Sequence, residues 1–294
     1  MKLSLMLNNL RQPFEESLNT VQRLKIPAIH LSADGRWDPA VCDTTCRKQL
    51  RSALDGRGLA ISALSGCGRA IDLGQPNQAK DNIATAQKAL EMAADLMGAA
   101  GVAGIWQDHV GVIPSSPDGP RWDSFVRCTQ AIARHGEKVG ACLAVETGPE
   151  PAFAVENLLR TVGSTALRVN YDPANLILYP ALFRSDPHLI EKFGRPAGPY
   201  EKAAAFREFE PIEGVRRLGR FIVHTHAKDA LVDGAVAREV PLGMGWVDWP
   251  RYLRLLKQVG YMGYLAIERE TGADPVGDIA QAAAFLREQL QALE

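Results

Sequence analysis

The chain has 294 residues, of which 46% are hydrophobic and 23% are charged, so it can bury a large core. Its 33 lysines and arginines balance 34 aspartates and glutamates, and the formal net charge is −1. Proteins that bind along a phosphate backbone normally carry a basic excess. The composition therefore argues against a nucleic-acid partner.

The apolar run at residues 1–7 is too short for a signal peptide or a membrane span, so we expect a soluble, cytoplasmic protein without membrane association. The cysteines are an odd set of five, which favours reduced thiols over disulfides. They are Cys42, Cys46, Cys67, Cys128 and Cys142. Cys42 and Cys46 have the spacing of half a zinc site, but no second pair completes it.

Short apolar segments alternate with longer amphipathic stretches along the chain. The segments expected to be strands lie near residues 3–7, 28–32, 59–64, 101–106, 141–146, 167–172, 220–226 and 263–268. The stretches between them, such as 80–98 and 249–259, have helical periodicity. Alternating strands and helices indicate an α/β fold with a parallel sheet, and eight repeats close a (βα)8 TIM barrel. We therefore predict one barrel domain over residues 1–294.

Residues 183–210 interrupt this rhythm, because they are charged and contain several prolines and glycines. They follow the sixth predicted strand, on the face where barrel active sites lie. Long loops in compact domains usually have a function or move. We expect either a lid over the site or an arm that joins copies of the chain in a homo-oligomer.

Four consecutive predicted strands end in side chains that bind metal ions. At the carboxyl ends of the fifth to eighth strands stand Glu146, Asp172, His226 and Glu268. Such ends meet at one mouth of a barrel. Three carboxylates there would repel one another and raise one another's pKa unless a cation neutralised them. We therefore predict that these residues hold one divalent metal ion.

Oxygen-rich ligation with a single imidazole suits Mn²⁺, which we predict, with Mg²⁺, Co²⁺ or Zn²⁺ as alternatives. Four protein ligands leave open positions where a sugar or polyol with adjacent oxygens could chelate. His224 lies two residues deeper than His226, and we expect it to support the site or pack the barrel. Glu270 shares the face of Glu268, and we prefer Glu268 as the ligand. The residues predicted to surround the substrate are Asn175, Lys228, Arg238, His224, Cys67, Trp106, Gln107 and Glu270.

Several motifs in the second half of the chain form a pattern known from other proteins. They are Val169-Asn-Tyr-Asp-Pro-Ala-Asn-Leu176, His224-Thr-His-Ala-Lys-Asp229, Val240-Pro-Leu-Gly243 followed by Gly245-Trp-Val-Asp-Trp249, Gly260-Tyr-Met-Gly-Tyr-Leu-Ala-Ile-Glu-Arg-Glu270, and Glu146-Thr-Gly148. Together they resemble the xylose isomerase-like sugar phosphate isomerase/epimerase family, part of the AP endonuclease family 2 superfamily of TIM barrels. The motifs cover mainly residues 140–290, and the first half agrees chiefly in its strand–helix rhythm.

The resemblance implies the same four metal ligands, with Glu146 and Glu268 also serving as acid and base. It implies a substrate contact three residues after the strand-six aspartate, which is commonly His and is Asn175 here. Arg238 resembles a substrate-gripping arginine of the ketose epimerases. A further epimerase glutamate, six residues past Glu146, is replaced by Ala152, which departs from the ketose 3-epimerase pattern.

The residues of strands two to four, among them Cys67, Trp106 and Gln107, look like a pocket wall. They do not supply the additional histidines that bind three metals in endonuclease IV, a nuclease of the same superfamily, so that function is disfavoured. Lys228 has two interpretations: it steadies an oxyanion or a leaving oxygen, or it forms a salt bridge with Asp229.

We predict a metal-dependent sugar or cyclitol isomerase or epimerase of enzyme class 5, working by proton transfer next to a metal-bound carbonyl. The alternative is a class 4 lyase or dehydratase acting on keto-sugars, keto-inositols or 3-keto-glycosides at the same metal site. A third hypothesis is a binding or assembly protein that keeps the barrel with an idle site. No cationic cluster accompanies Gly243 and Gly245, so a substrate phosphate is not indicated.

Overall fold

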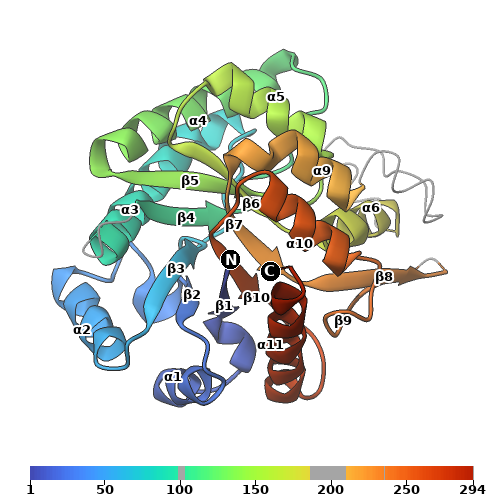
Figure 1. The fold of residues 1–294 in the computed structure, drawn as a ribbon. Coiled ribbons are helices and arrows are strands. Elements are labelled where there is room, and N and C mark those ends of the chain that lie inside the picture. Colours follow the sequence, from blue (N-terminus) through green and yellow to red (C-terminus); the bar gives the residue numbers. More distant parts are fainter. Residues whose placement is uncertain (99–102, 186–209, 235, 294) are drawn as a thin grey trace.

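Parallel strands close on themselves to form a barrel in the order β1-β10-β7-β6-β5-β4-β3-β2 (Figure 1). The computed structural model describes residues 1–98, 103–185, 210–234 and 236–293. The barrel strands are β1 (Lys2–Met6), β2 (Ala28–Ser32), β3 (Ala60–Ser65), β4 (Gly104–Asp108), β5 (Ala141–Glu146), β6 (Leu167–Tyr171), β7 (Ile222–Ala227) and β10 (Tyr264–Ile267). Pairing of β10 with β1 closes the sheet, and the predicted (βα)8 barrel is confirmed.

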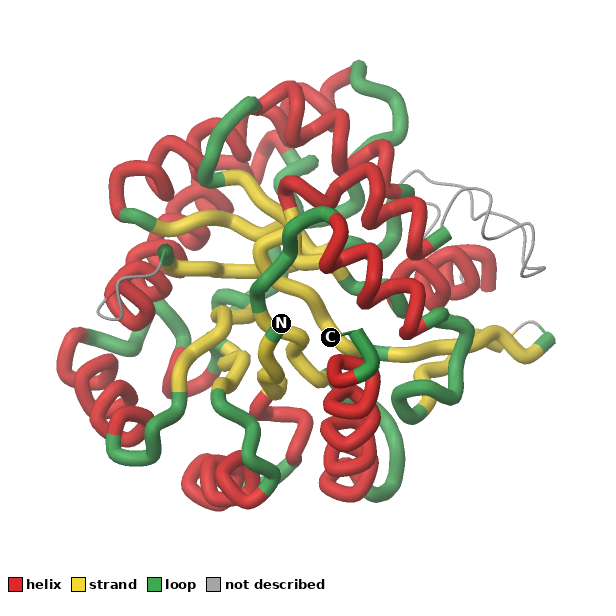
Figure 2. The backbone as a smooth tube through the Cα atoms, viewed as in Figure 1, coloured by secondary structure: helices red, strands yellow, loops and turns green. Residues whose placement is uncertain are grey.

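Helices surround the barrel, as Figure 2 shows in red around the yellow strands. They are α1 (Phe14–Arg23), α2 (Thr44–Asp55), α3 (Ala79–Gly98), α4 (Gly119–Val139), α5 (Ala152–Val162), α6 (Asn175–Ser185), α9 (Pro211–Leu218), α10 (Trp249–Gln258) and α11 (Pro275–Gln291). Short 3-10 turns are η1 (Leu7–Leu10), η2 (Gly35–Trp37), η3 (Pro76–Gln78) and η4 (Gly219–Phe221).

Helix α10 illustrates how the sequence builds this outer layer. The side chain of Asp248 accepts a hydrogen bond from the backbone N–H of Arg251 at 3.1 Å, which caps the helix start. Apolar side chains then recur every three or four residues and form one buried face. They are Trp249, Tyr252, Leu253 and Leu256. This face packs the helix onto the barrel while charged residues between them face solvent.

An antiparallel hairpin between β7 and α10 was not foreseen from the sequence. It consists of β8 (Asp229–Asp233) and β9 (Val236–Val240), and it extends away from the barrel beside α6 (Figure 1). The turn begins at Gly234, directly after the paired residue Asp233, and its φ of +60° is the left-handed conformation that tight hairpin turns need. The hairpin therefore lengthens the loop that follows β7 at the mouth of the barrel.

Cys42 and Cys46 form a disulfide, so the expectation of reduced thiols is wrong for this pair. The side chain of Asp43 caps α2 by accepting from the N–H of Cys46 at 2.9 Å. This first helical turn brings the two cysteine Cα atoms to 5.3 Å, within the range that a disulfide spans. The remaining cysteines are free and buried: Cys67, Cys128 and Cys142.

The segment 183–210, predicted to be a long loop, begins inside α6, which ends at Ser185. Residues 186–209 lie outside the described residues, so the predicted lid or oligomer arm stays a prediction. In the part of the chain that the structure describes, no helix is both long and apolar enough to cross a membrane.

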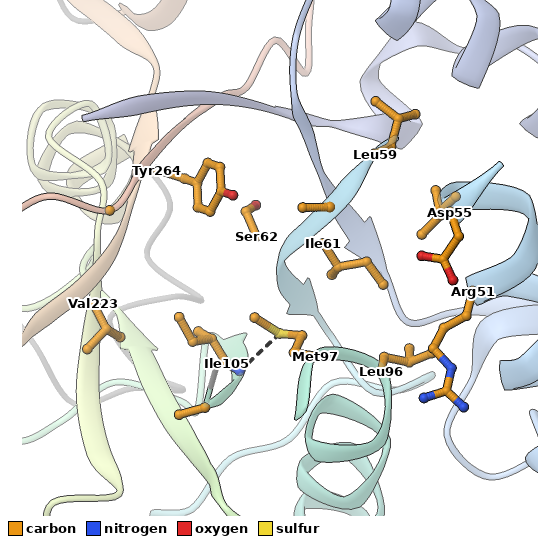
Figure 3. Close-up of a pocket in the computed structure, with 14 residues that line it drawn as sticks. Arg51, Asp55, Leu59, Ile61, Ser62, Leu96, Met97, Ile105, Val223 and Tyr264 are labelled. Carbon is orange, nitrogen blue, oxygen red and sulfur yellow. Dashed lines mark hydrogen bonds between the residues drawn. The ribbon is translucent and has the colours of Figure 1, made fainter. Parts of the chain in front are cut away.

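A cavity of about 540 Å³ lies at the amino-terminal end of the barrel. Figure 3 shows its apolar wall, which includes Ile61, Ile105, Val223 and Tyr264 from the first halves of four strands. Chemistry in TIM barrels takes place at the opposite end, where the strands finish. The cavity is therefore separate from the site described next.

Candidate metal centre

The four residues predicted to bind a metal ion meet at the carboxyl-terminal mouth of the barrel. Glu146 is the last residue of β5, Asp172 follows β6, His226 lies in β7 and Glu268 follows β10. One nitrogen or oxygen atom from each lies within 4.8 Å of the others, and all four side chains are buried. Residues far apart in the sequence thus form one cluster.

The imidazole of His226 stands at the centre of this cluster. Its Nδ1 atom lies 2.9 Å from Oε2 of Glu268, 3.2 Å from Oε1 of Glu146 and 3.6 Å from Oδ2 of Asp172. Among the described residues, Nδ1 of His226, Oδ2 of Asp172 and Oε2 of Glu268 are buried without a hydrogen-bond partner. Buried polar atoms rarely lack partners. Their convergence on one point fits ligands that surround a cation.

The turn after β6 aims Asp172 into the cluster. Its Oδ1 atom accepts hydrogen bonds from the backbone N–H groups of Ala174 at 2.8 Å and Asn175 at 3.1 Å. The backbone N–H of Asp172 donates to Oγ1 of Thr147 at 2.8 Å. One carboxylate oxygen is thereby held by the start of α6, and Oδ2 is left facing His226.

Glu146 is held from two sides. Its Oε1 atom accepts a hydrogen bond from Nδ2 of Asn175 at 2.9 Å. Its Oε2 atom lies 3.6 Å from Nε2 of His109, whose ring is also 3.3 Å from the hydroxyl of Tyr179. Gly148 lies against this pair, because a Cβ atom there would come within 3.0 Å of both rings. Glycine at position 148 therefore leaves room for the rings of His109 and Tyr179 near Glu146.

The cluster shifts the pKa values of its members. Burial raises the pKa of Asp172 to about 6, although Lys228 and His226 oppose the rise. Burial also raises the pKa of Glu146, but His109 and His226 outweigh it and hold the value at about 2. Burial lowers the pKa of His226, and its carboxylate neighbours outweigh this and raise it well above the usual value. Positive charge at this point is thus strongly favoured.

Lys228 lies next to three carboxylates, two of them in the cluster. Its buried Nζ atom contacts the carboxylate of Glu270 and lies 3.3 Å from Oε2 of Glu268 and 3.9 Å from Oδ2 of Asp172. One of its two predicted roles, a salt bridge with Asp229, is absent from the contacts of the described residues. The Asp229 carboxylate instead binds backbone N–H groups and the Trp249 indole.

Two other residues predicted to bind substrate, His224 and Arg238, lie outside the four-residue cluster. His224 is buried deeper in the barrel, where its ring contacts Asn170 and Ser62. The side chain of Arg238 is 57% exposed on the hairpin and is 4.0 Å from Asp233. The structure places no contact between Arg238 and the cluster within the described residues.

The three predicted residues of the pocket wall are turned to other partners. Trp106 is fully buried and donates from Nε1 to the carbonyl of Gly66 at 2.8 Å. Gln107 donates from Nε2 to Oγ of Ser65 at 2.7 Å. Cys67 lies 3.5 Å from Oδ2 of Asp108, and burial raises the pKa of the thiol to about 12. None of these contacts reaches the four-residue cluster directly.

Sequence reasoning missed Asp108, His109, Tyr179 and His30. The fourth strand was predicted to end near residue 106, whereas β4 runs to Asp108, so Asp108 and His109 were not counted as mouth residues. Burial raises the pKa of Asp108 to about 7, with His109 and the Cys67 thiol lowering it. A correct strand end would have placed a carboxyl group and an imidazole beside Glu146.

Comparison with known proteins extends over most of the chain. A model for the family described as xylose isomerase-like TIM barrel matches residues 19–289. A crystal structure of a xylose isomerase domain protein from Planctomyces limnophilus is 25% identical, with a TM-score of 0.74 over 94% of this chain and 92% of that one. A D-tagatose 3-epimerase-like protein is 17% identical, with a TM-score of 0.73 over 100% and 98%. The latter likeness shows a shared fold.

Three further proteins are similar to this chain. A Mycobacterium smegmatis xylose isomerase-like barrel, solved in complex with magnesium, is 18% identical, with a TM-score of 0.70 over 100% of this chain and 97% of that one. The uncharacterised protein YfiH of Bacillus subtilis is 22% identical over 92% of this chain and 93% of its own. The L-ribulose-5-phosphate 3-epimerase UlaE of Escherichia coli is 38% identical over 71 residues, which is 24% of each chain.

Proposed function

Because the chain belongs to the xylose isomerase-like TIM barrel family, we propose that it is a divalent-metal-dependent isomerase or epimerase of sugars or cyclitols. The observation that carries this proposal is the convergence of Asp172 Oδ2, His226 Nδ1 and Glu268 Oε2, all buried without hydrogen-bond partners among the described residues. The sugar epimerases among the similar structures support the substrate class. That the enzyme works in the cytoplasm stays a prediction.

The donor set fits a hard or borderline divalent ion, because Glu146, Asp172 and Glu268 offer oxygen and His226 offers one nitrogen. Mn²⁺ is our preferred ion, and the magnesium complex of a similar barrel keeps Mg²⁺ as an alternative. A divalent ion bound here would supply positive charge that stabilises the negative charge developing on a substrate carbonyl oxygen.

Proton transfer is assigned to the two glutamates. Glu146 and Glu268 approach the same His226 nitrogen from β5 and from beyond β10, so they stand on different sides of the site. His109 and His226 lower the pKa of Glu146 by more than burial raises it. His226 and Lys228 lower the pKa of Glu268 in the same way, so both carboxylates are ionised at neutral pH. One carboxylate removes the proton next to the substrate carbonyl and becomes a carboxylic acid. In isomerisation this acid returns the proton to the neighbouring carbon. In epimerisation the other glutamate, after taking up a proton from water, delivers it to the opposite face, and the first acid releases its own proton to water.

A lyase or dehydratase is the second candidate, and His109 favours it. The ring is 37% exposed and lies 3.6 Å from Oε2 of Glu146, so an additional proton donor stands beside a proposed base. In this reaction Glu146 removes the proton next to the carbonyl, a hydroxyl group β to the carbonyl leaves, and His109 protonates it to release water. Keto-sugars, keto-inositols and 3-keto-glycosides contain this arrangement of groups.

The test is a screen of keto-sugars and inososes in heavy water with Mn²⁺ added, followed by mass spectrometry and NMR. We expect deuterium at the substrate carbon next to the carbonyl without loss of mass, which an isomerase or epimerase produces. Loss of one water molecule from the substrate would favour the lyase. A protein that binds no divalent ion and turns over no substrate would refute both and leave the binding or assembly hypothesis.

A further inference from the structure

A chain of hydrogen bonds runs through the barrel interior beneath the four-residue cluster. The side chain of Asn170, in β6, lies with Nδ2 3.2 Å from Nε2 of His226 and with Oδ1 2.9 Å from Nδ1 of His224. The other ring nitrogen of His224, Nε2, is 3.1 Å from Oγ of Ser62 in β3. We call Asn170, His224 and Ser62 the core relay. All three are buried, so the relay joins His226 to the opposite wall of the barrel.

The far end of the core relay is fixed to two more strands. The hydroxyl of Ser62 donates to the carbonyl of Ile29 at 3.1 Å and lies 2.7 Å from Oγ of Ser4. A hydroxyl has one proton, so a Ser62 that donates to Ile29 accepts from His224 Nε2–H. A neutral imidazole with its proton on Nε2 has a lone pair on Nδ1. His224 Nδ1 then needs a donor from Asn170.

The two nitrogens of His226 have different tasks. Nδ1 faces Glu146, Asp172 and Glu268, and it must offer a lone pair there if a cation is bound. The imidazole proton then resides on Nε2, where a buried N–H without an acceptor would be costly. Ligating histidines usually donate this second N–H to a nearby oxygen.

We propose that Asn170 is a positioning residue for the metal ligand His226. A half-turn of its amide exchanges oxygen and nitrogen, which have nearly the same shape. The nitrogen then donates to Nδ1 of His224, and the oxygen accepts the Nε2–H of His226. Every donor of the core relay meets an acceptor in this arrangement, and Nδ1 of His226 is left to face the carboxylates. The inference rests on the proposed function, because it assumes that the cluster binds a divalent ion.

His30 is the competing partner for the same atom. Its Nδ1 atom also lies 3.2 Å from Nε2 of His226, and the ring is fully buried in β2. However, Nε2 of His30 has no hydrogen-bond partner among the described residues, so a neutral His30 that accepted from His226 through Nδ1 would leave its own Nε2–H buried without an acceptor. Asn170 is anchored from its other side by His224, and it is therefore the better candidate.

The first experiment measures Mn²⁺ and Co²⁺ binding by titration calorimetry for the whole protein and for three variants. Asn170→Leu keeps the volume but removes the hydrogen bonds, and we expect affinity to fall by about 10–100-fold. Asn170→Asp keeps an acceptor for His226, and we expect affinity within a few-fold of wild type. His30→Leu should have the smaller effect. Unchanged binding by Asn170→Leu, or a loss confined to His30→Leu, would overturn the inference.

A second measurement does not depend on the variants folding. Long-range ¹H–¹⁵N NMR of the Mg²⁺-loaded or Zn²⁺-loaded wild-type protein reports which nitrogen of each histidine carries the proton. We expect the His226 proton on Nε2 and the His224 proton also on Nε2. A His224 proton on Nδ1 would contradict the core relay. If the wild type binds no divalent ion, the proposed function fails together with this inference, whereas ion binding with the opposite His224 tautomer removes the inference alone.

Discussion

Nδ1 of His226 lies 2.9 Å from Oε2 of Glu268, between the ends of neighbouring strands β7 and β10. The imidazole is fully buried and the carboxylate nearly so. At this separation the two atoms are close enough to share one proton or to bind the same cation. Both residues belong to the candidate metal centre, and their substitutions have different expected results.

Replacing His226 by Ala should abolish ion binding. The variant loses the only nitrogen ligand of the proposed set and leaves buried carboxylates facing one another, so we expect affinity for Mn²⁺ to fall by more than about 100-fold. Thermal unfolding gives a second measurement, because a ligand at 100 times its Kd stabilises the wild type by about 2.7 kcal/mol. His135→Ala, which removes a hydrogen bond with Glu91 on the outer helices, is the matched control. If Mn²⁺ raised the unfolding temperature of His226→Ala as much as that of the wild type, the ligand assignment would be contradicted.

Replacing Glu146 or Glu268 by Gln should stop turnover while the fold survives. The amide keeps the shape but cannot take up the substrate proton, so we expect kcat to fall by about 100–10,000-fold. Circular dichroism and thermal unfolding check the fold. Glu156→Gln, at an ion pair with Arg217 away from the cluster, is the control. Wild-type turnover by Glu268→Gln would remove its assignment as a base.

The barrel and the clustering of the four residues at its mouth could be predicted because both depend on local patterns. Each strand is a short apolar run, and each residue of the candidate metal centre stands where a run ends. An error of two residues in the end of β4 was enough to hide Asp108 and His109. Strand boundaries depend on pairing with neighbours, which a single apolar run does not specify.

The contacts between distant residues were beyond reach of the sequence. Asn170 and His226 are 56 positions apart, and His30 and His226 are 196 positions apart. Their contacts depend on which strand residues turn into the barrel, and β6 pairs with β7 through an irregular register. The disulfide was missed for a different reason, since the odd number of cysteines outweighed the closeness of Cys42 and Cys46 at a helix start.

Replacing Lys228 by Met should separate ion binding from turnover. The ammonium group lies 3.3 Å from Oε2 of Glu268, so it competes with a cation for the same carboxylate, and its loss should leave Mn²⁺ affinity equal or higher. We predict that its charge also stabilises negative charge on the substrate, so that kcat falls by about 100-fold in the variant. Lys138→Met, exposed at the end of α4, controls for loss of a lysine. Weaker Mn²⁺ binding with normal kcat would contradict this role.

Replacing Asp229 by Ala should lower stability without changing ion affinity. The carboxylate accepts from the backbone N–H groups of Gly243 at 2.9 Å and Gly245 at 3.1 Å and from the indole N–H of Trp249 at 2.9 Å. Loss of these bonds leaves buried donors unpaired, so we expect a loss of about 3 kcal/mol in the free energy of unfolding by urea. Asp233→Ala, 78% exposed, should change little. Equal stabilities of the two variants would refute the account.

Replacing Asp108 by Asn should stabilise the ion-free protein at high pH. Burial raises the pKa of Asp108 from 3.8 to about 7. Well below pH 3.8, the folded and unfolded chains both carry the proton. As the pH rises from there to about 7, the unfolded chain releases it first, so unfolding is increasingly favoured, and above this range the penalty is constant. Asn never ionises and avoids the penalty.

We therefore expect the free energy of unfolding at pH 8 to be higher for Asp108→Asn than for wild type by about 1 kcal/mol or more. This corresponds to a rise of roughly 2 °C in Tm. The gain should shrink when the same pair is compared at pH 5, because less of the penalty has built up in the wild type there. Thermal unfolding in the presence of a chelator measures both differences. Asp123→Asn, on the exposed side of α4, should give no pH-dependent gain. A gain for Asp108→Asn that is the same at pH 5 and pH 8 would show that the carboxyl group is ionised throughout, and the burial argument for its pKa would be wrong.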